Sequence, residues 1–380
     1  GKPMSKIEKQ FNNKLSKGKD IFLTLDIKLQ NIMKEEISIG LKKFNAKNAG
    51  GLIMDVDTGD ILSMVSLPDY DPNYPSQIKP FTENNIITSA RYEMGSTLKT
   101  FNIAMTLKNK TVSSDELFDI SEPYKLTDKY LVHDISRISE PVNLTTIFKQ
   151  SSNIGAVKIY ERNGREKQKN FFKLVGLTDH TEVRGVQTIR NKFPKNWNET
   201  KAKSISFGYA ASITPISLAS SFSTLINGGY KLKPNIILEK EKKKDLNNRE
   251  KIISNELSSS IVNLLHEVVK DGTAKNAKVL GIEVGGKTGT ARKSINGHYN
   301  DQKIITSFIG FFPIERPKYL SLIIFDEPRI NKEESDINLY GGNTAAPIFS
   351  KIVERSSSIL KIWPKKQDSK YQFSEAPNKD

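Results

Sequence analysis

A serine and a lysine stand three residues apart in the stretch "MGSTLKTFNIAMTL", residues 94 to 107. If Ser96 opens a helix, its side chain and that of Lys99 project from one face within reach of each other. A serine hydroxyl is a weak nucleophile until a base removes its proton, and an uncharged lysine can be that base. The apolar residues after Lys99 predict burial, which favours the neutral amine. The pair therefore predicts an acyl-transfer site.

The same spacing also has an ordinary structural explanation. Serine is a common helix-capping residue. The spacing recurs in this Lys- and Ser-rich chain at Ser16/Lys19, Ser76/Lys79 and Ser358/Lys361. Spacing alone therefore leaves both catalysis and capping open for Ser96.

A second candidate motif, Ser151-Ser152-Asn153, interrupts a helical pattern. Serine and asparagine favour such breaks because their side chains hydrogen-bond to nearby backbone groups. As structure, the motif is an ordinary helix junction. As chemistry, Ser151 could relay a proton and Asn153 could hold a substrate amide.

The most specific motif is Lys287-Thr288-Gly289-Thr290, within "VGGKTGTARK" on a predicted strand. The glycines leave this strand bare where another backbone could lie alongside. Lys287, Thr288 and Thr290 supply a cation and two hydroxyls, which suit a carboxylate. A plain glycine-rich edge strand would not explain why these residues flank the bare position.

The composition excludes several classes of protein. The chain has 380 residues, 37% of them hydrophobic, enough for a sizeable core. It has no cysteine, which excludes disulfides and thiolate chemistry. The four histidines are far apart and lack metal-site spacing, so neither a metal nor another cofactor is expected. The formal net charge of +15 comes from scattered lysines without a nucleic-acid-binding motif, so no nucleic-acid partner is expected.

Hydrophobic periodicity predicts strands near both ends of the chain and helices between them. Strands are predicted at residues 20–29, on both sides of Asp57-Thr58-Gly59, and at 282–293, 303–313 and 318–326. Among the helices, one is predicted to begin at a cap on Asn255 and to stop at Gly272. This order indicates an α+β fold with a mainly antiparallel central sheet, built from both chain ends and packed between helices.

The three motifs occur in the order known for β-lactamases and penicillin-binding proteins. Further stretches, among them "MDVDTGDILSMVS", "GYAASITPISLASSF" and "YGGNTAAPIF", extend the similarity over about residues 21 to 362. In these stretches the chain resembles the transpeptidase domain of class B penicillin-binding proteins, which crosslink bacterial peptidoglycan. The stretch "SFIGFFPIERPKY" resembles the septal, cell-division branch of that family.

The resemblance implies catalytic roles for four residues. Ser96 attacks the carbonyl of the penultimate D-Ala of a stem peptide, expels the terminal D-Ala and forms an acyl-enzyme. Lys99 accepts the serine proton, Ser151 helps pass it to the leaving group, and Asn153 contacts Lys99 and the substrate amide. An amine from a neighbouring stem peptide then resolves the ester. β-Lactam antibiotics imitate the D-Ala-D-Ala end and stall the enzyme at the acyl stage.

The resemblance also implies how the strand motif acts. Lys287 raises the local positive potential and keeps Lys99 deprotonated. Thr288 and Thr290 bind the terminal carboxylate, while the strand through Gly289 pairs with the substrate backbone. The backbone N–H groups of Ser96 and Thr290 form the oxyanion hole.

The family's organisation gives further expectations. Residues 1–20 are a linker or a remnant of an N-terminal pedestal domain, residues 21–364 the transpeptidase domain, and residues 365–380 a flexible tail. The domain is expected in the periplasm, anchored in the inner membrane by an N-terminal helix absent from this chain. Its expected partners are divisome membrane proteins, including a glycosyltransferase.

Two other functions share these motifs. A serine β-lactamase would deacylate rapidly, but no element that would position its water-activating carboxylate is evident between the second and third motifs. A β-lactam sensor would bind the antibiotic without turning it over. Its sequence would be expected to resemble class D lactamases, and the motif Ser151-Ser152-Asn153 is not typical of them. The lifetime of the acyl-enzyme separates a transpeptidase from a lactamase.

Overall fold

The computed structural model describes residues 20–364, apart from residues 79, 81, 83, 239–248, 296 and 330–337. The predicted linker, except for Asp20, and the predicted tail at 365–380 lie outside the described residues, as do Lys19 and Lys79. Within the described ranges, no helix is both long enough and apolar enough to cross a membrane.

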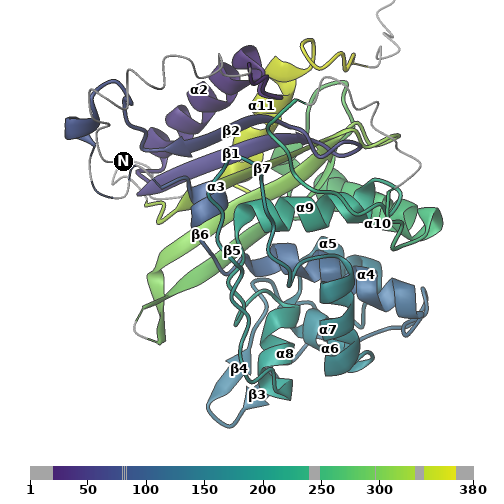
Figure 1. The fold of residues 1–380 in the computed structure, drawn as a ribbon. Coiled ribbons are helices and arrows are strands. Elements are labelled where there is room, and N and C mark those ends of the chain that lie inside the picture. The colour runs from purple at the N-terminus through teal and green to yellow at the C-terminus, as the bar shows by residue number, and fades with distance from the viewer. Residues whose placement is uncertain are drawn as a thin grey trace, which may run out of the picture.

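The centre of the described part of the chain is a five-stranded antiparallel sheet in the order β2-β1-β7-β6-β5. Its strands are β1 (Asn48–Asp55), β2 (Ile61–Leu67), β5 (Gly285–Ile295), β6 (His298–Phe312) and β7 (Tyr319–Asp326). β7 pairs with β1 along its whole length, so both ends of the chain build one sheet. The predicted α+β architecture is confirmed (Figure 1).

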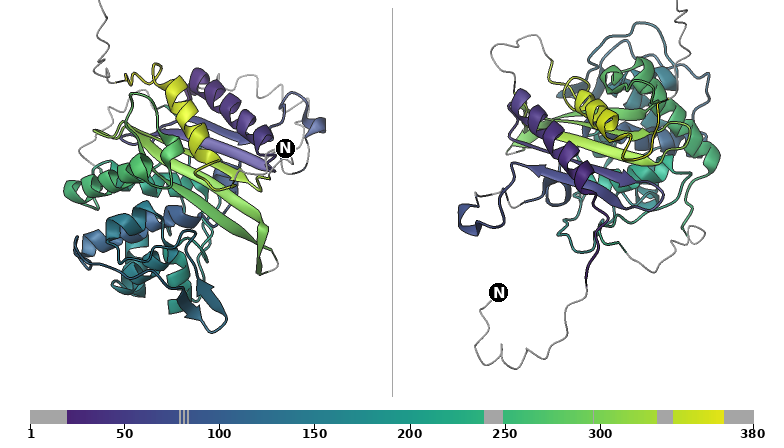
Figure 2. Two further views of the ribbon diagram at one scale, coloured as in Figure 1. Left: turned by 180° about the vertical axis from the view of Figure 1, so that it is seen from behind. Right: turned by 90° about the horizontal axis from the view of Figure 1, so that it is seen from above.

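Helices cover both faces of the sheet (Figures 1 and 2). α2 (Ile27–Lys43) and α11 (Ala345–Ser356) pack together on one face. α3 (Ile86–Ser89), α9 (Pro215–Ile226) and α10 (Asn255–Asp271) lie on the other face. Because both faces are covered, every residue of the central strand β7 is buried, whereas the edge strand β2 alternates between buried and half-buried residues.

The remaining elements form a mainly helical lobe beside the edge strand β5, at the bottom of Figure 1. The lobe consists of α4 (Lys99–Asn109), α5 (Leu144–Lys149), α6 (Asn153–Glu161), α7 (Arg165–Leu174), α8 (Glu199–Ser206) and the hairpin of β3 (Tyr124–Thr127) and β4 (Tyr130–Val132). Phe101 of α4 makes edge-on ring contacts with Phe172 of α7 and Phe222 of α9, at centroid distances of 6.2 and 6.4 Å. These buried aromatic contacts join α4 both to the rest of the lobe and to α9 under the sheet.

Three 3-10 helices complete the described elements: η1 (Pro75–Gln77), η2 (Gly95–Leu98) and η4 (Lys275–Ala277). η2 packs directly against β5 and so joins the lobe to the edge of the sheet.

Two predictions of local structure are wrong. Residues 20–29 do not form a regular strand, because Leu23 makes only an isolated bridge to Ile237 and Asp26 caps α2 by accepting hydrogen bonds from two backbone N–H groups of its first turn. The helix α10 is capped by Ser254 rather than Asn255: the Ser254 hydroxyl accepts from the Leu257 N–H. The predicted end of α10 at Gly272 is confirmed.

Candidate active site

Ser96 lies on η2, which continues directly into α4 with Lys99 as its first residue. Gly95 has a φ of 54°, and a β-carbon on it would lie 2.3 Å from the carbonyl oxygen of Thr290 in β5. Only glycine therefore lets this segment approach the edge strand so closely. The Ser96 hydroxyl is half-buried and makes no hydrogen bond to any residue that the structure describes, which leaves it free to meet a substrate.

Gly289 permits the same approach from the strand side. A β-carbon on Gly289 would lie 2.7 Å from the carbonyl oxygen of Met94 and 2.4 Å from Ser307 Oγ. The sequence predicted that this glycine makes room for another backbone. The backbone that lies against it belongs to the chain itself, at Met94, two residues before Ser96.

Lys99 is buried, with 2% of its surface exposed. Its Nζ donates to the Ser151 carbonyl oxygen at 2.5 Å and Asn153 Oδ1 at 2.7 Å, and lies 3.3 Å from Ser151 Oγ. Burial lowers the pKa of Lys99 to about 7, although the negative charge of Asp134 acts in the opposite direction. A neutral amine has two N–H groups, enough for the two short bonds, so its lone pair remains available to accept a proton.

Lys287 of β5 is also fully buried, and its Nζ donates to Ser151 Oγ at 2.8 Å. The Ser151 hydroxyl therefore lies between two amines. Burial, and next the charge of Lys99, lower the pKa of Lys287 well below its ordinary value. Burial is the first cause of the lowered pKa for both amines, and the expectation that the charge of Lys287 keeps Lys99 neutral stays a prediction.

The second motif is held in place by Asp134, a residue just beyond the β3–β4 hairpin. Ser151 has a φ of 60°, a conformation that non-glycine residues rarely adopt, and Ser152 caps α6. The Asp134 carboxylate accepts from Ser152 Oγ at 2.5 Å and from the backbone N–H groups of Asn153 and Ile154 at 2.5 and 3.1 Å. These bonds fix the strained turn, and with it the Asn153 amide that faces Lys99.

The threonines of the third motif contact two segments that lie far away in the sequence. Thr288 Oγ1 lies 3.1 Å from Thr273 Oγ1, just after α10. Thr290 Oγ1 accepts from the Gly341 N–H at 3.0 Å, in the segment before α11. Both hydroxyls are therefore oriented by neighbours along the edge strand.

The family description "Penicillin binding protein transpeptidase domain" matches residues 49–354, from β1 to α11. The chain belongs to this family. It is 32% identical over 356 residues to the probable peptidoglycan D,D-transpeptidase FtsI of Caulobacter vibrioides, an alignment that covers 90% of this chain and 59% of that protein. It is 30% identical over 369 residues to the probable peptidoglycan D,D-transpeptidase PenA of Neisseria gonorrhoeae, covering 96% and 61%. The chain thus spans about three fifths of the length of these relatives.

A solved structure of the same family has the same fold. The transpeptidase domain of penicillin-binding protein 3 from Burkholderia pseudomallei superposes with a TM-score of 0.78 at 27% identity, over 93% of this chain and all of that one. The structure brings the three predicted motifs of the transpeptidase domain to one place, where η2, the α5–α6 junction and β5 meet.

Some residues that position the motifs of this transpeptidase domain were not predicted. Asp134, Thr273 and Gly341 had no predicted role, although Gly341 lies in the stretch "YGGNTAAPIF", and each reaches its partner only through the fold. His133 is similar, because its carbonyl oxygen accepts from Asn153 Nδ2 at 2.9 Å. The only sequence signal at Asp134 is an acidic residue that could cap a helix, and the helix in question begins 19 residues later.

Glu93 links the segment of the transpeptidase domain that carries Ser96 to the β5–β6 hairpin. Its Oε1 accepts from the Ala210 N–H at 2.7 Å and from the Tyr299 hydroxyl at 3.0 Å. The Tyr299 ring in turn packs edge-on against Tyr209, with 5.1 Å between centroids. Burial raises the pKa of the Glu93 carboxyl. These contacts fix the hairpin beside the segment that carries Ser96.

The acylation rate of the transpeptidase domain by a penicillin is expected to rise with pH through about 7 and to level off above it. Below the Lys99 pKa of about 7, the amine is protonated and cannot accept the serine proton; above it, the neutral amine can. Second-order rate constants for a fluorescent penicillin, measured from about pH 5 to about pH 9, report this group in the free protein. A midpoint in the ordinary lysine range, near pH 10, would contradict the role of burial.

Replacing Asp134 by asparagine is expected to move that pH midpoint downward, because the carboxylate charge raises the pKa of Lys99. The variant also loses a charged acceptor for two backbone N–H groups and a hydroxyl, at a cost of about 1–3 kcal/mol in the free energy of unfolding. The matched control is Asp128→Asn, an exposed residue on the same hairpin. If both variants gave the same pH profile as the parent protein, Asp134 would have no electrostatic influence on Lys99.

Proposed function

We propose that this domain is a serine-dependent peptidoglycan D,D-transpeptidase. The observation that carries the proposal is the arrangement of the Ser151 hydroxyl between two buried amines, Lys99 and Lys287, next to a segment that presents Ser96 with a free hydroxyl. Acyl transfer from a peptide needs a nucleophile, a base that is neutral near pH 7, and a route for a proton to the leaving amine.

In the first half of the reaction, Ser96 Oγ attacks the carbonyl carbon of the penultimate D-Ala, and its proton moves to Lys99 Nζ. When the C–N bond breaks, the leaving D-Ala nitrogen takes up a proton. The Ser151 hydroxyl can relay it, because Ser151 Oγ accepts from one amine and can donate onward. In the second half, an amine of a neighbouring stem peptide attacks the ester, loses a proton to the same base and releases Ser96.

The edge strand supplies the binding groups for the donor peptide. Among the described strands, β5 pairs only with β6, so its other edge near Gly289 can accept an extended substrate backbone. Thr288 and Thr290 offer hydroxyls for the terminal carboxylate, on the same strand as the buried Lys287 amine. The backbone of Gly95 lies against that of Thr290, and this closeness supports an oxyanion hole formed by the N–H groups of Ser96 and Thr290.

The position and lifetime of a penicillin adduct test this proposal. The protein is treated with a penicillin, and its intact mass and proteolytic peptides are measured by mass spectrometry. A single adduct on the peptide that contains Ser96, stable for hours, is expected for a transpeptidase. An adduct elsewhere would overturn the assignment. A lifetime far below a second would make the protein a β-lactamase. A stable adduct without formation of crosslinked product from stem peptides would fit a sensor.

We further infer that the whole protein works in septal cell-wall synthesis in the periplasm, with membrane-bound divisome proteins and a glycosyltransferase as partners. The resemblance of "SFIGFFPIERPKY", residues 307 to 319, to the septal branch supports this inference. Depleting the protein from its cells should give filaments with unfinished septa. Swollen, rounded cells would point to elongation instead.

A further inference from the structure

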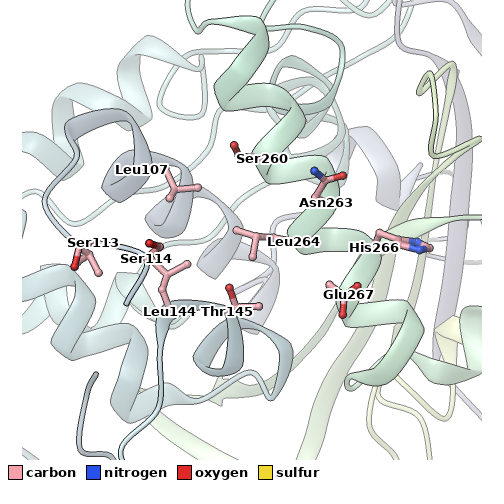
Figure 3. Close-up of a pocket in the computed structure, with 11 residues that line it drawn as sticks. Leu107, Ser113, Ser114, Leu144, Thr145, Ser260, Asn263, Leu264, His266 and Glu267 are labelled. Atoms are coloured by element: carbon pink, nitrogen blue, oxygen red, sulfur yellow. The ribbon is translucent and has the colours of Figure 1, made fainter. Parts of the chain in front are cut away.

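A cavity that none of the motif residues line lies among the helices of the domain. It has a volume of about 470 Å³ and is enclosed by the end of α4, the segment that follows, the start of α5 and one side of α10 (Figure 3). Leu107, Leu144 and Leu264 line it with apolar side chains, and the exposed Ser113 and Ser260 lie at its opening. Cavities of this size and polarity are typical of small-molecule sites.

The charges at the cavity select among ligands. The described residues that line it include no lysine or arginine, although the chain has 58 of these residues and a formal net charge of +15. Glu267 brings a carboxylate, which pairs only loosely with Lys270 at 3.7 Å. The His266 ring points away from the leucines in Figure 3, and its Nδ1 lies 3.0 Å from the Val284 carbonyl oxygen. A ligand with an apolar body and a cationic end fits this lining.

Each wall of the cavity continues into one of the three motifs. α4 begins with Lys99, and α5 ends two residues before Ser151. α10 ends beside Thr273, whose hydroxyl lies 3.1 Å from that of Thr288. A ligand that contacts all three helices favours whichever arrangement of them fits it best. It can therefore change the relative positions of the groups that activate Ser96.

We propose that this cavity is an effector site for a small apolar molecule that carries an amine, and that its occupation changes the rate of acylation at Ser96. The second half of this statement rests on the proposed function. Binding itself needs no reaction at Ser96, so a failure of binding and a failure of the proposed function are distinguishable.

Two probes of similar size and opposite charge, 4-phenylbutylamine and 4-phenylbutanoate, test the binding. Isothermal calorimetry is carried out on the free protein and on the penicillin-acylated protein. We expect saturable binding of the amine to both, and binding of the carboxylate about fivefold weaker or more, as a partly exposed carboxylate predicts. Absence of saturable binding at millimolar amine would overturn the proposal. Loss of binding on acylation combined with unchanged binding to the Leu264→Phe variant would also overturn it, because the probe would then occupy the cleft at Ser96 and not this cavity.

Variants locate the probe and test its effect. Glu267→Gln should abolish the preference for the amine, whereas Glu256→Gln, on the same helix but outside the cavity, should keep it. Leu264→Phe fills the cavity and should weaken binding of the amine at least tenfold. If this variant fails to fold, the comparison of Glu267→Gln with Glu256→Gln still tests the proposal. Saturating amine should change the acylation rate constant at least twofold in the parent protein. Binding without such a change would overturn the effector role.

Discussion

Replacing Ser96 by alanine is expected to abolish covalent labelling by a fluorescent penicillin while leaving the fold intact. The hydroxyl is the only group of Ser96 that can form the ester, and water cannot substitute for it in a covalent adduct. The same hydroxyl has no hydrogen-bond partner among the described residues, so its loss should change the free energy of unfolding by no more than about 0.5 kcal/mol. Gel fluorescence measures labelling, and thermal unfolding measures stability.

The matched control is Ser358→Ala. Ser358 also stands three residues before a lysine, Lys361, but lies exposed after α11 and far from the motifs in sequence. It should label like the parent protein. A Ser96→Cys variant adds the only thiol of the chain, so its alkylation by iodoacetamide in the folded state measures how accessible this atom is. Full labelling of Ser96→Ala would remove Ser96 from its role, and an equal loss of labelling in Ser358→Ala would point to the copy at Ser358 and Lys361.

The architecture could be predicted from sequence because its strands and helices carry strong local patterns. The second half of β6 and nearly all of β7 are predominantly apolar, as expected for strands buried on both faces. The prediction failed at residues 20–29, where alternation suggested a strand. There the capping of α2 by Asp26 decided the local structure, and only Leu23 found a bridge partner. Local alternation does not reveal whether a partner strand is available.

The three motifs could be predicted because each combines reactive residue types at a short spacing. Their mutual positions could not, since they depend on contacts such as Asp134 to Ser152 and Thr273 to Thr288, which join residues 18 and 15 positions apart. The spacing of Ser96 and Lys99 also could not show which cause lowers the pKa of Lys99 most. The apolar residues after Lys99 predicted burial, whereas the effect of the Lys287 charge was implied only by the family resemblance. The structure makes burial the main cause and places the Lys99 charge among the causes that lower the pKa of Lys287.

Replacing Lys99 by methionine or by arginine is expected to slow acylation about 10²- to 10⁴-fold, the usual contribution of a positioned general base. Methionine has no basic group. Arginine keeps the positive charge but cannot lose its proton at any accessible pH. If Lys99 works as a neutral base, both variants are therefore equally deficient, and the rise in rate through about pH 7 disappears in both. Stopped-flow acylation with a fluorescent penicillin gives the rate constants.

The comparison between the two variants separates a base from a fixed charge. A buried ammonium could instead stabilise the oxyanion or orient Asn153, whose Oδ1 lies 2.7 Å from Nζ; in that case Lys99→Arg would retain most of the rate. Lys108→Met, an exposed residue at the other end of α4, controls for the loss of a lysine from this helix. Thermal unfolding checks that the buried site tolerates each change. An arginine variant within tenfold of the parent rate would show that the proton of Ser96 goes to another group, and Ser151, held by Lys287 at 2.8 Å, would be the next candidate.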